Sequence, residues 1–161
     1  RETNVMEKTR RNYRGILPLL LLVAALPLAA WLLKGNTAQA ESGPKHMTDP
    51  AKALAAAKKT GKIVMMDVYT DWCGWCKRLD SDVYAKPDVA KAIAKDFVFL
   101  KINPEKGAAN RKFVDKYGVE GYPAIIFLSG AGKEVHRING YVPAPEFLKE
   151  MAKAKAAAKK R

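Results

Sequence analysis

Both cysteines of this 161-residue chain lie in one short stretch, and that stretch constrains the fold more than any other feature. They are Cys73 and Cys76, with the spacing C-x-x-C. The apolar run from Ile63 to Val68 leads into them, and helix-forming residues from Lys77 to Val83 follow. This order predicts a buried strand, a tight turn and a helix that has Cys73 at its N-terminus.

The expected position of Cys73 predicts its chemistry. Unpaired backbone N–H groups and the positive end of the helix dipole favour an anion at a helix N-terminus. A thiolate is such an anion and is the nucleophilic form of cysteine, so we expect Cys73 to be the attacking thiol. Cys76 lies one turn further along the helix, where we expect it to be more buried and to act as the resolving thiol.

Other interpretations of C-x-x-C are half of a zinc site, a copper-chaperone site, or two inert buried cysteines. A structural zinc site usually has four cysteine or histidine ligands at matching spacings. This chain has no third cysteine, and its two histidines, His46 and His136, are far apart in sequence. The pattern therefore favours redox chemistry with the cysteine pair alone, without a metal or any other cofactor.

The charge of the chain is strongly positive, +13 at pH 7, and residues 41–161 alone carry +9. Such a charge permits contact with acidic proteins or with membrane surfaces. No nucleic-acid-binding motif accompanies it, and most lysines alternate with alanines on expected helix faces, which is typical of a solvated surface. We therefore expect protein partners and no nucleic acid.

Residues 1–40 have the order of an export signal. A basic segment precedes the 18-residue apolar run from Ile16 to Leu33, and the A-x-A sequence at 38–40 follows. Cleavage after Ala40 would leave Glu41 as the new N-terminus. The apolar run is also long enough to be considered an uncleaved membrane anchor. Either alternative places the rest of the chain in the periplasm or another exported location.

The remaining chain is expected to alternate between strands and helices. Residues 41–49 read as a linker, 50–151 as one domain, and 152–161 as a basic C-terminal tail that frays. The expected strands are 63–69, 97–102, 124–128 and 134–138, and the expected helices are 51–59, 77–83, 88–95, 108–117 and one that begins at Pro145. Central strands separated by helices predict an α/β fold: a mixed sheet, flanked by helices, with a parallel core and an antiparallel edge hairpin.

Over about residues 50–151 the chain resembles the thioredoxin superfamily. The motifs that carry the resemblance are, in order, Asp67, Trp72-Cys73-Gly74-Trp75-Cys76-Lys77, Lys101, Gly121-Tyr122-Pro123 and Gly140. The sequence looks closest to exported thioredoxin-like proteins, and is similar to the C-terminal periplasmic domain of the thiol:disulfide interchange reductase. Gly74-Trp75 departs from the Gly-Pro of thioredoxin, which leaves the redox direction open.

The resemblance implies roles for three residues besides the cysteines. Asp67 would be the buried carboxylate that exchanges a proton with Cys76, and burial would bring its pKa closer to neutrality. Lys101 would face this carboxylate. Pro123 would be the cis-proline beside the disulfide, a geometry that is common only before proline. Their alternatives are a hydrated strand-end aspartate, a solvent-facing lysine and an ordinary trans proline.

The substrate-binding surface is expected around the cysteines and the proline. Trp72 and Trp75 flank Gly74 and the cysteines, where they would form an apolar docking rim or simply pack against the helix. The backbone of Tyr122 would pair with an extended substrate segment.

Two functions of different classes follow from these features. The first is an exported dithiol–disulfide oxidoreductase, a monomer, that exchanges electrons with protein thiols and disulfides and with a membrane redox partner, as a reductant more than as an oxidant. The second is a thioredoxin-like module that binds client proteins or a metal without turnover. Loss of disulfide reduction in Cys73→Ser would distinguish the first from the second.

Overall fold

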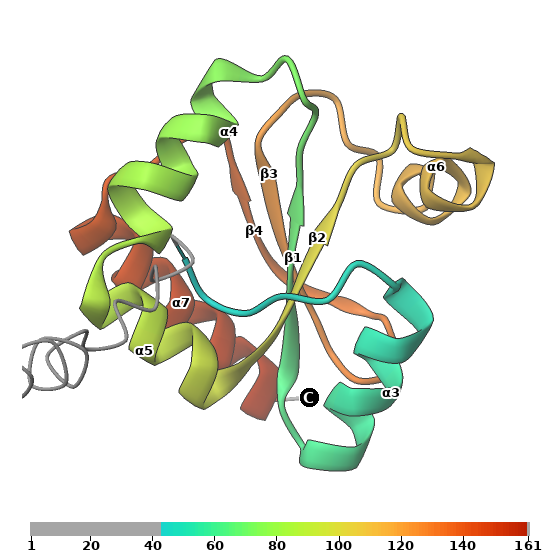
Figure 1. Ribbon diagram of the computed structural model, residues 1–161. Helices are drawn as coiled ribbons and strands as arrows, with labels where there is room; N and C mark the ends of the chain where they lie inside the picture. Colours follow the sequence, from blue (N-terminus) through green and yellow to red (C-terminus); the bar gives the residue numbers. More distant parts are fainter. Residues whose placement is uncertain (1–42, 161) are drawn as a thin grey trace, which may run out of the picture. The chain divides into compact units, whose positions relative to one another are not determined.

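The computed structural model of the protein describes residues 43–160 (Figure 1). The predicted signal or anchor at 1–40 lies outside these residues. Among the described residues, no helix has the length and apolar character needed to cross a membrane. The helices are α3 (Pro50–Thr60), α4 (Gly74–Leu79), α5 (Pro87–Asp96), α6 (Ala108–Asp115) and α7 (Ala144–Lys159), and η1 (Asp80–Tyr84) is a π-helical turn. The strands are β1 (Ile63–Val68), β2 (Phe97–Ile102), β3 (Ala124–Leu128) and β4 (Glu134–Asn139).

The four strands form one mixed sheet in the order β2-β1-β3-β4. β1 and β2 are parallel, whereas β3 is antiparallel to both β1 and β4. The mixed α/β fold is therefore as predicted, but the parallel core is limited to one pair of strands. The sequence predicts antiparallel pairing only within the edge hairpin of β3 and β4, and not between β1 and β3.

The short helix α6 explains the direction of β3. To begin a strand parallel to β2, the chain must first return to the opposite end of the sheet, where β2 begins. The eight residues of α6 cover only about 12 Å, whereas a six-residue strand spans about 20 Å. Figure 1 shows α6 beside the end of the sheet where β2 stops, and β3 starts from that same end.

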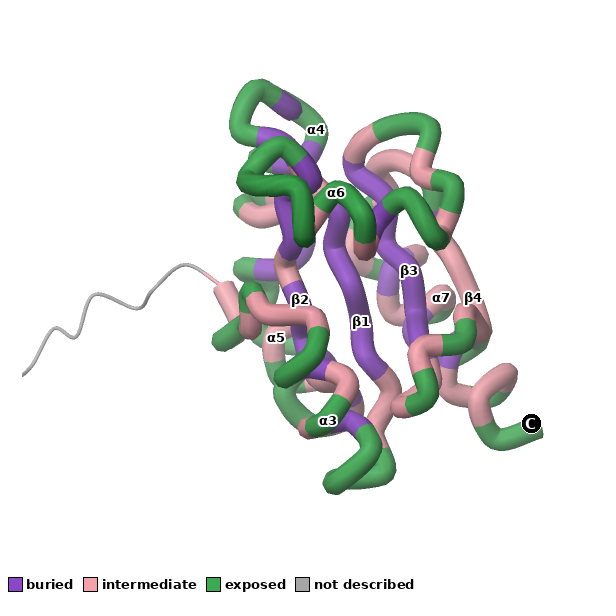
Figure 2. Tube along the Cα trace, turned by 90° about the vertical axis from the view of Figure 1, so that its right-hand side faces the viewer, coloured by how far each residue is buried: buried purple, intermediate pink, exposed green. Residues whose placement is uncertain are grey.

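Helices cover both faces of the sheet, so β1 and β3 are buried along most of their length (Figure 2). One face packs Met65 and Phe99 against α4, η1, α5 and α7, and the other packs Val64 and Met66 against α3. Successive strand residues point to opposite faces. Asp67 therefore shares the face of Met65, and Lys101 the face of Phe99, beneath α4 and η1.

The predicted C-terminal tail is helical over most of its described length, residues 152–160, because α7 continues to Lys159. Ala154 is fully buried, and the Nζ atom of Lys155 lies 2.6 Å from a carboxylate oxygen of Asp96 at the end of α5. The small side chain of Ala154 allows α7 to pack closely at this point.

The described part of the expected linker contacts the sheet. Met47 forms an isolated parallel bridge with Leu100 at the outer edge of β2. Asp49 then caps α3 by accepting hydrogen bonds from the backbone N–H groups of Ala51 and Lys52, at 2.9 and 3.1 Å. The sequence did not predict the pairing of Met47 with β2.

Candidate active site

The two cysteines lie where β1 has ended and α4 begins. They are joined by a disulfide, with their Cα atoms 5.3 Å apart. Cys73 is the N-cap of α4, and its Sγ atom accepts a hydrogen bond of 3.1 Å from the backbone N–H of Cys76. This is the helix N-terminus that the sequence predicted for Cys73, and its N–H groups favour negative charge on that sulfur.

The expected difference in burial between the cysteines is absent from this oxidised form. Both cysteines are 4 % exposed, so Cys76 is not the more buried of the two. The disulfide itself accounts for this, because it holds both sulfurs together above the first turn of α4. In this oxidised form, therefore, the position at the helix N-terminus distinguishes Cys73 from Cys76, and exposure does not.

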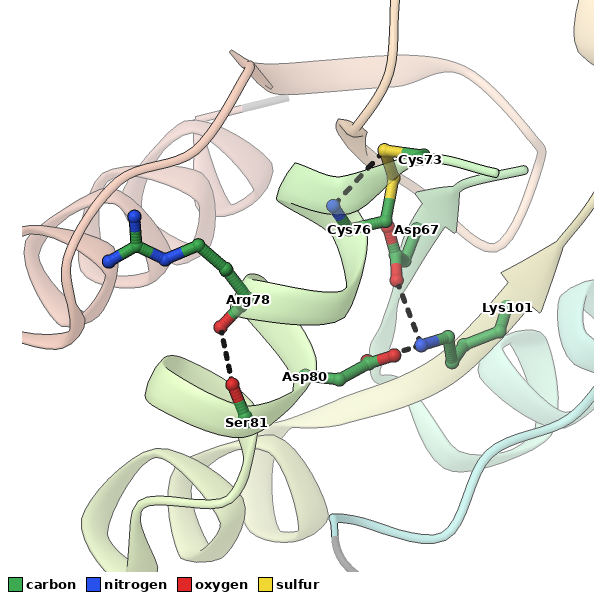
Figure 3. Close-up of polar contacts among 7 residues, drawn as sticks. All are labelled: Asp67, Cys73, Cys76, Arg78, Asp80, Ser81 and Lys101. Carbon is green, nitrogen blue, oxygen red and sulfur yellow. Dashed lines mark hydrogen bonds and ion pairs between the residues drawn. A yellow bond between two sulfur atoms is a disulfide. The ribbon is translucent and has the colours of Figure 1, made fainter. Parts of the chain in front are cut away.

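A buried carboxylate lies on the same face of the sheet as the disulfide-bearing helix. Asp67 is 1 % exposed, and it pairs in register with Lys101 across β1 and β2. The Nζ atom of Lys101 lies 3.4 Å from Oδ2 of Asp67. Figure 3 shows the Asp67 side chain beneath the disulfide, with its carboxylate pointing to Lys101.

A second acid completes this group. Lys101 also donates a hydrogen bond to Asp80 in η1, so one ammonium group bridges two carboxylates (Figure 3). The side chain of Lys101 is only 11 % exposed, whereas that of Asp80 is 46 % exposed. We call these three residues, Asp67, Asp80 and Lys101, the buried ionic group.

Burial dominates the electrostatics of Asp67. Desolvation raises the pKa of its carboxyl from 3.8 to about 6, the charge of Lys101 acts in the opposite direction, and the charge of Asp80 adds to the increase. For Lys101, burial lowers the pKa, but the two aspartates outweigh it and the net pKa is raised. Lys101 thus stays charged at neutral pH, whereas the Asp67 carboxyl titrates at about pH 6, close to neutrality.

Two tyrosines lie around the buried ionic group. The Nζ atom of Lys101 is 5.1 Å from the ring centre of Tyr69 and 5.6 Å from that of Tyr84. The hydroxyl of Tyr84 is buried and has no hydrogen-bond partner among the described residues. Burial and then the charges of Asp67 and Asp80 raise the pKa of Tyr84, so its phenol stays protonated and can donate a hydrogen bond.

The outer surface around the disulfide is aromatic. Trp72 and Trp75 are 67 % and 54 % exposed, the only large apolar side chains so exposed in the part of the chain that the structure describes. The indole N–H of Trp72 donates to the carboxylate of Glu105 at 3.1 Å. Trp75 packs against Tyr141, with ring centres 5.5 Å apart. Both predicted rim residues are therefore exposed, and each is also held by a neighbour.

The Tyr122–Pro123 peptide bond is cis, and Pro123 lies immediately before β3. A groove of about 240 Å³ runs between Trp75, Tyr122, Pro123 and Tyr141. The Tyr122 ring also makes an edge-on contact with Trp72, at 5.9 Å between ring centres. The structure therefore gathers the residues predicted to bind substrate on one surface.

Gly74, the remaining residue of that predicted surface, is the first residue of α4 and is exposed. No atom lies within 4 Å of the position that a Cβ atom would occupy there. A side chain would therefore extend into solvent on the substrate side.

Five contributors to the site were not predicted from the sequence: Tyr69, Asp80, Tyr84, Glu105 and Tyr141. Asp80 had a usable signal, because it follows Cys76 by four residues and lies on the same face of an expected helix. Glu105 and Tyr141 lie in loops after β2 and β4, where no periodic pattern assigns a direction to a side chain. The described residues contain no cluster of three or more histidine, cysteine, aspartate or glutamate residues that could hold a metal ion.

Comparison with known proteins agrees with this geometry. A family model described as the thioredoxin-like domain matches residues 50–155. The thiol:disulfide interchange protein DsbD of Escherichia coli strain K12 is 34 % identical over 153 residues, which cover 87 % of this chain and 26 % of that protein. The protein of the same name from Yersinia pestis strain Pestoides F is 29 % identical over 147 residues, 86 % of this chain and 24 % of that protein.

A solved structure gives the same result for the fold. A thioredoxin from Thermus thermophilus superimposes with a TM-score of 0.63 and 28 % identity, over 70 % of this chain and 88 % of that one. The chain spans about a quarter of the length of the curated relatives above. The family match and the disulfide-bonded cysteine pair support the predicted enzyme class, a thiol:disulfide oxidoreductase.

Proposed function

Because the chain belongs to the thioredoxin-like domain family, we propose that it is an exported dithiol–disulfide oxidoreductase that reduces disulfides of substrate proteins. The observation that carries this proposal is the position of the disulfide. It lies at the start of α4, between an exposed aromatic surface and a buried carboxyl whose pKa is about 6. Such a site can hold a protein segment outside and accept a proton inside.

The reaction proceeds in two exchanges. In the reduced enzyme the Cys73 thiolate attacks one sulfur of a substrate disulfide, forms a mixed disulfide and releases the other substrate sulfur as a thiolate. The Cys76 thiol then transfers its proton to the Asp67 carboxylate and attacks Cys73. This forms the Cys73–Cys76 disulfide, which the structure contains, and releases the second substrate sulfur as a thiolate. Two electrons have passed from the enzyme to the substrate.

Residues around the cysteines assist each exchange. The N–H of Cys76 already donates to the Cys73 sulfur and stabilises negative charge there. The groove beside Tyr122 and Pro123 receives the substrate backbone, and Trp72 and Trp75 cover its apolar side chains. Lys101 keeps the ionised Asp67 from being isolated in the core.

The direction, location and partner are inferred from the sequence and the relatives. The curated relatives are named for thiol:disulfide interchange, which supports the same chemistry in this chain. The basic and apolar order of residues 1–40 supports export by a cleaved signal or an anchor. We therefore propose protein substrates, a membrane redox partner that supplies the electrons, a monomeric state and no cofactor beyond the cysteine pair.

Insulin reduction tests the proposed activity. The wild type should accelerate reduction by dithiothreitol, Cys73→Ser should not, and Cys76→Ser should accumulate mixed disulfides with substrate proteins. A wild type without activity whose Cys73→Ser variant still binds the same clients would favour a binding module without turnover. The exposed tryptophans are the observation behind that second candidate.

N-terminal sequencing tests the proposed export. The mature form should begin at Glu41, in the soluble periplasmic fraction. A membrane-bound protein that retains the 16–33 apolar run would replace cleavage with anchoring, and would leave the chemistry of the domain unchanged.

A further inference from the structure

The residues just before α3 run along the outer edge of β2. We call residues 43–47 the edge segment; they belong to the cyan stretch ahead of α3 in Figure 1. The N–H of Met47 donates to the carbonyl of Phe99 at 2.8 Å, and the N–H of Lys101 donates to the carbonyl of Met47 at 2.9 Å. The second bond holds the backbone of Lys101, whose side chain pairs with Asp67.

A cavity of about 300 Å³ lies between the edge segment and the buried ionic group. Gly43, Pro44 and His46 line one side of the cavity, and Asp80, Lys101 and Tyr84 line the other. One water occupies about 30 Å³ in the liquid, so the cavity has room for several. The lining includes two charged side chains, Asp80 and Lys101, and the phenols of Tyr69 and Tyr84, and such polar groups favour the binding of water.

Two buried polar atoms at this place have no partner among the described residues. They are the hydroxyl of Tyr84, which lines the cavity, and Oδ1 of Asp67. Asp67 lies directly behind the cavity, 3.4 Å from the Lys101 ammonium that lines it. Buried polar groups are nearly always hydrogen-bonded to protein or to ordered water. Water in this cavity would satisfy Tyr84 and continue towards Asp67.

We propose that this cavity is the route by which Asp67 exchanges protons with solvent, and that the edge segment is the positioning element that forms its outer wall. The inference rests on the proposed function for the origin of the proton, which Asp67 accepts from Cys76. A water in the cavity then takes that proton from Asp67 and passes it to solvent. Without this step Asp67 would remain protonated and could not serve the next cycle.

The wall also controls how far solvent reaches Asp67. The groups that face this carboxyl are Lys101 from β2, Asp80 and Tyr84 from η1, and the cysteine pair from α4; its partner in β3 is the apolar Ile125. At the cavity, the edge segment contributes one further titratable side chain, that of His46. Burial is the largest cause of the raised Asp67 pKa, so detaching the wall should admit water and lower that pKa.

Proline substitution in the edge segment tests this. Met47→Pro removes the N–H that bonds to Phe99, whereas Lys45→Pro is the matched control because Lys45 takes part in neither bond to β2. The carboxyl ¹³C shift of Asp67 is followed against pH in the oxidised full chain. We expect the titration midpoint to fall by about one pH unit in Met47→Pro, with faster amide exchange at Lys101. The control should keep the wild-type midpoint.

A second variant covers the case in which Met47→Pro leaves the pairing intact. Pro44→Gly with His46→Gly keeps both hydrogen bonds but removes two side chains from the wall, and its midpoint should fall in the same direction. Unchanged midpoints in both variants would overturn the proposal. The titration needs no substrate or turnover, so its failure is distinct from a failure of the insulin assay.

Discussion

Above the disulfide, Trp72 and Trp75 expose large apolar side chains to solvent; below it, Asp67 has its carboxylate in the core, 1 % exposed. Large apolar side chains are usually buried and ionisable side chains are usually exposed, and here both are reversed. Exposed apolar surface usually marks a site of protein contact, and a buried ionisable group usually marks a site of chemistry. The two departures lie on opposite sides of one pair of sulfurs.

This contrast separates recognition from proton transfer. The aromatic surface should determine which proteins reach Cys73, and hence the first exchange. The buried ionic group should determine how fast Cys76 loses its proton, and hence the second exchange. Variants on the two sides should therefore affect different steps, and the following predictions test that division from the largest effect to the smallest.

The largest effect is expected for Asp67→Asn. An asparagine keeps the shape of the side chain but cannot accept the proton of Cys76, so resolution of the mixed disulfide should slow by roughly 100-fold or more. The first attack by Cys73 should change little. Single-turnover disulfide exchange, measured against pH for the wild type and the variant, separates the two rates.

Asp67→Glu is a useful companion to that variant. It keeps an acceptor carboxylate, so it should retain more of the resolution rate than asparagine does. Identical rates and pH profiles in the wild type and Asp67→Asn would mean that Asp67 is structural, and that protons leave Cys76 by another path.

The same carboxyl should make the stability of the oxidised protein depend on pH. Its pKa is about 6 in the folded state against 3.8 as an ordinary value, so between these values the folded state holds a proton that the unfolded state has lost. The contribution of the Asp67 carboxyl to the free energy of unfolding is therefore highest below pH 4. It falls as the pH rises to 6, by up to about 3 kcal/mol. Urea unfolding at pH 4 and pH 8 should show this loss as a difference between wild type and Asp67→Asn, because the other carboxyls titrate in both.

The sequence predicted the strands well because each is an apolar run with clear ends; 97–102 and 124–128 match β2 and β3 residue for residue. The direction of β3 was not predicted, because it depends on how far α6 carries the chain and not on the strand itself. The edge segment was missed for another reason. Residues 43–47 include a glycine and a proline, and their pairing with β2 uses backbone groups that any sequence has.

The site shows the same limit. Both cysteines and the cap at Cys73 follow from local spacing. The contact between Lys101 and Asp67 requires the register of two strands, so local patterns do not specify it, and only the family resemblance predicted it. Asp80 follows Cys76 by four residues, so a helical pattern places both on one face, but its contact with Lys101 also depends on the π-helical turn η1 and on the position of β2. Long-range register and irregular turns are therefore where inference from local sequence patterns stopped.

A smaller effect is expected for Asp80→Asn. The negative charge of Asp80 raises the pKa of Asp67, so its removal should lower that pKa and move the midpoint of the resolution profile to lower pH, by less than one unit. Asp82→Asn is the matched control: Asp82 lies in the same turn but pairs with Arg78, at 3.3 Å, and not with Lys101. Equal shifts in the two variants would mean that general surface charge, and not the buried ionic group, sets the midpoint.

The smallest effect is expected on the outer surface, for Glu105→Ala. Glu105 accepts the indole N–H of Trp72, and without it the ring keeps its contact with Tyr122 but loses one fixed orientation. An exposed hydrogen bond lies at the lower end of the usual range, about 0.5–1 kcal/mol, so KM for a protein disulfide should rise about two- to fivefold. Glu105→Gln keeps an acceptor oxygen and should restore most of the loss. The resolution rate and the Asp67 titration should not change in either variant, because Glu105 lies on the recognition side; a change in either would show that the two regions are coupled through the disulfide.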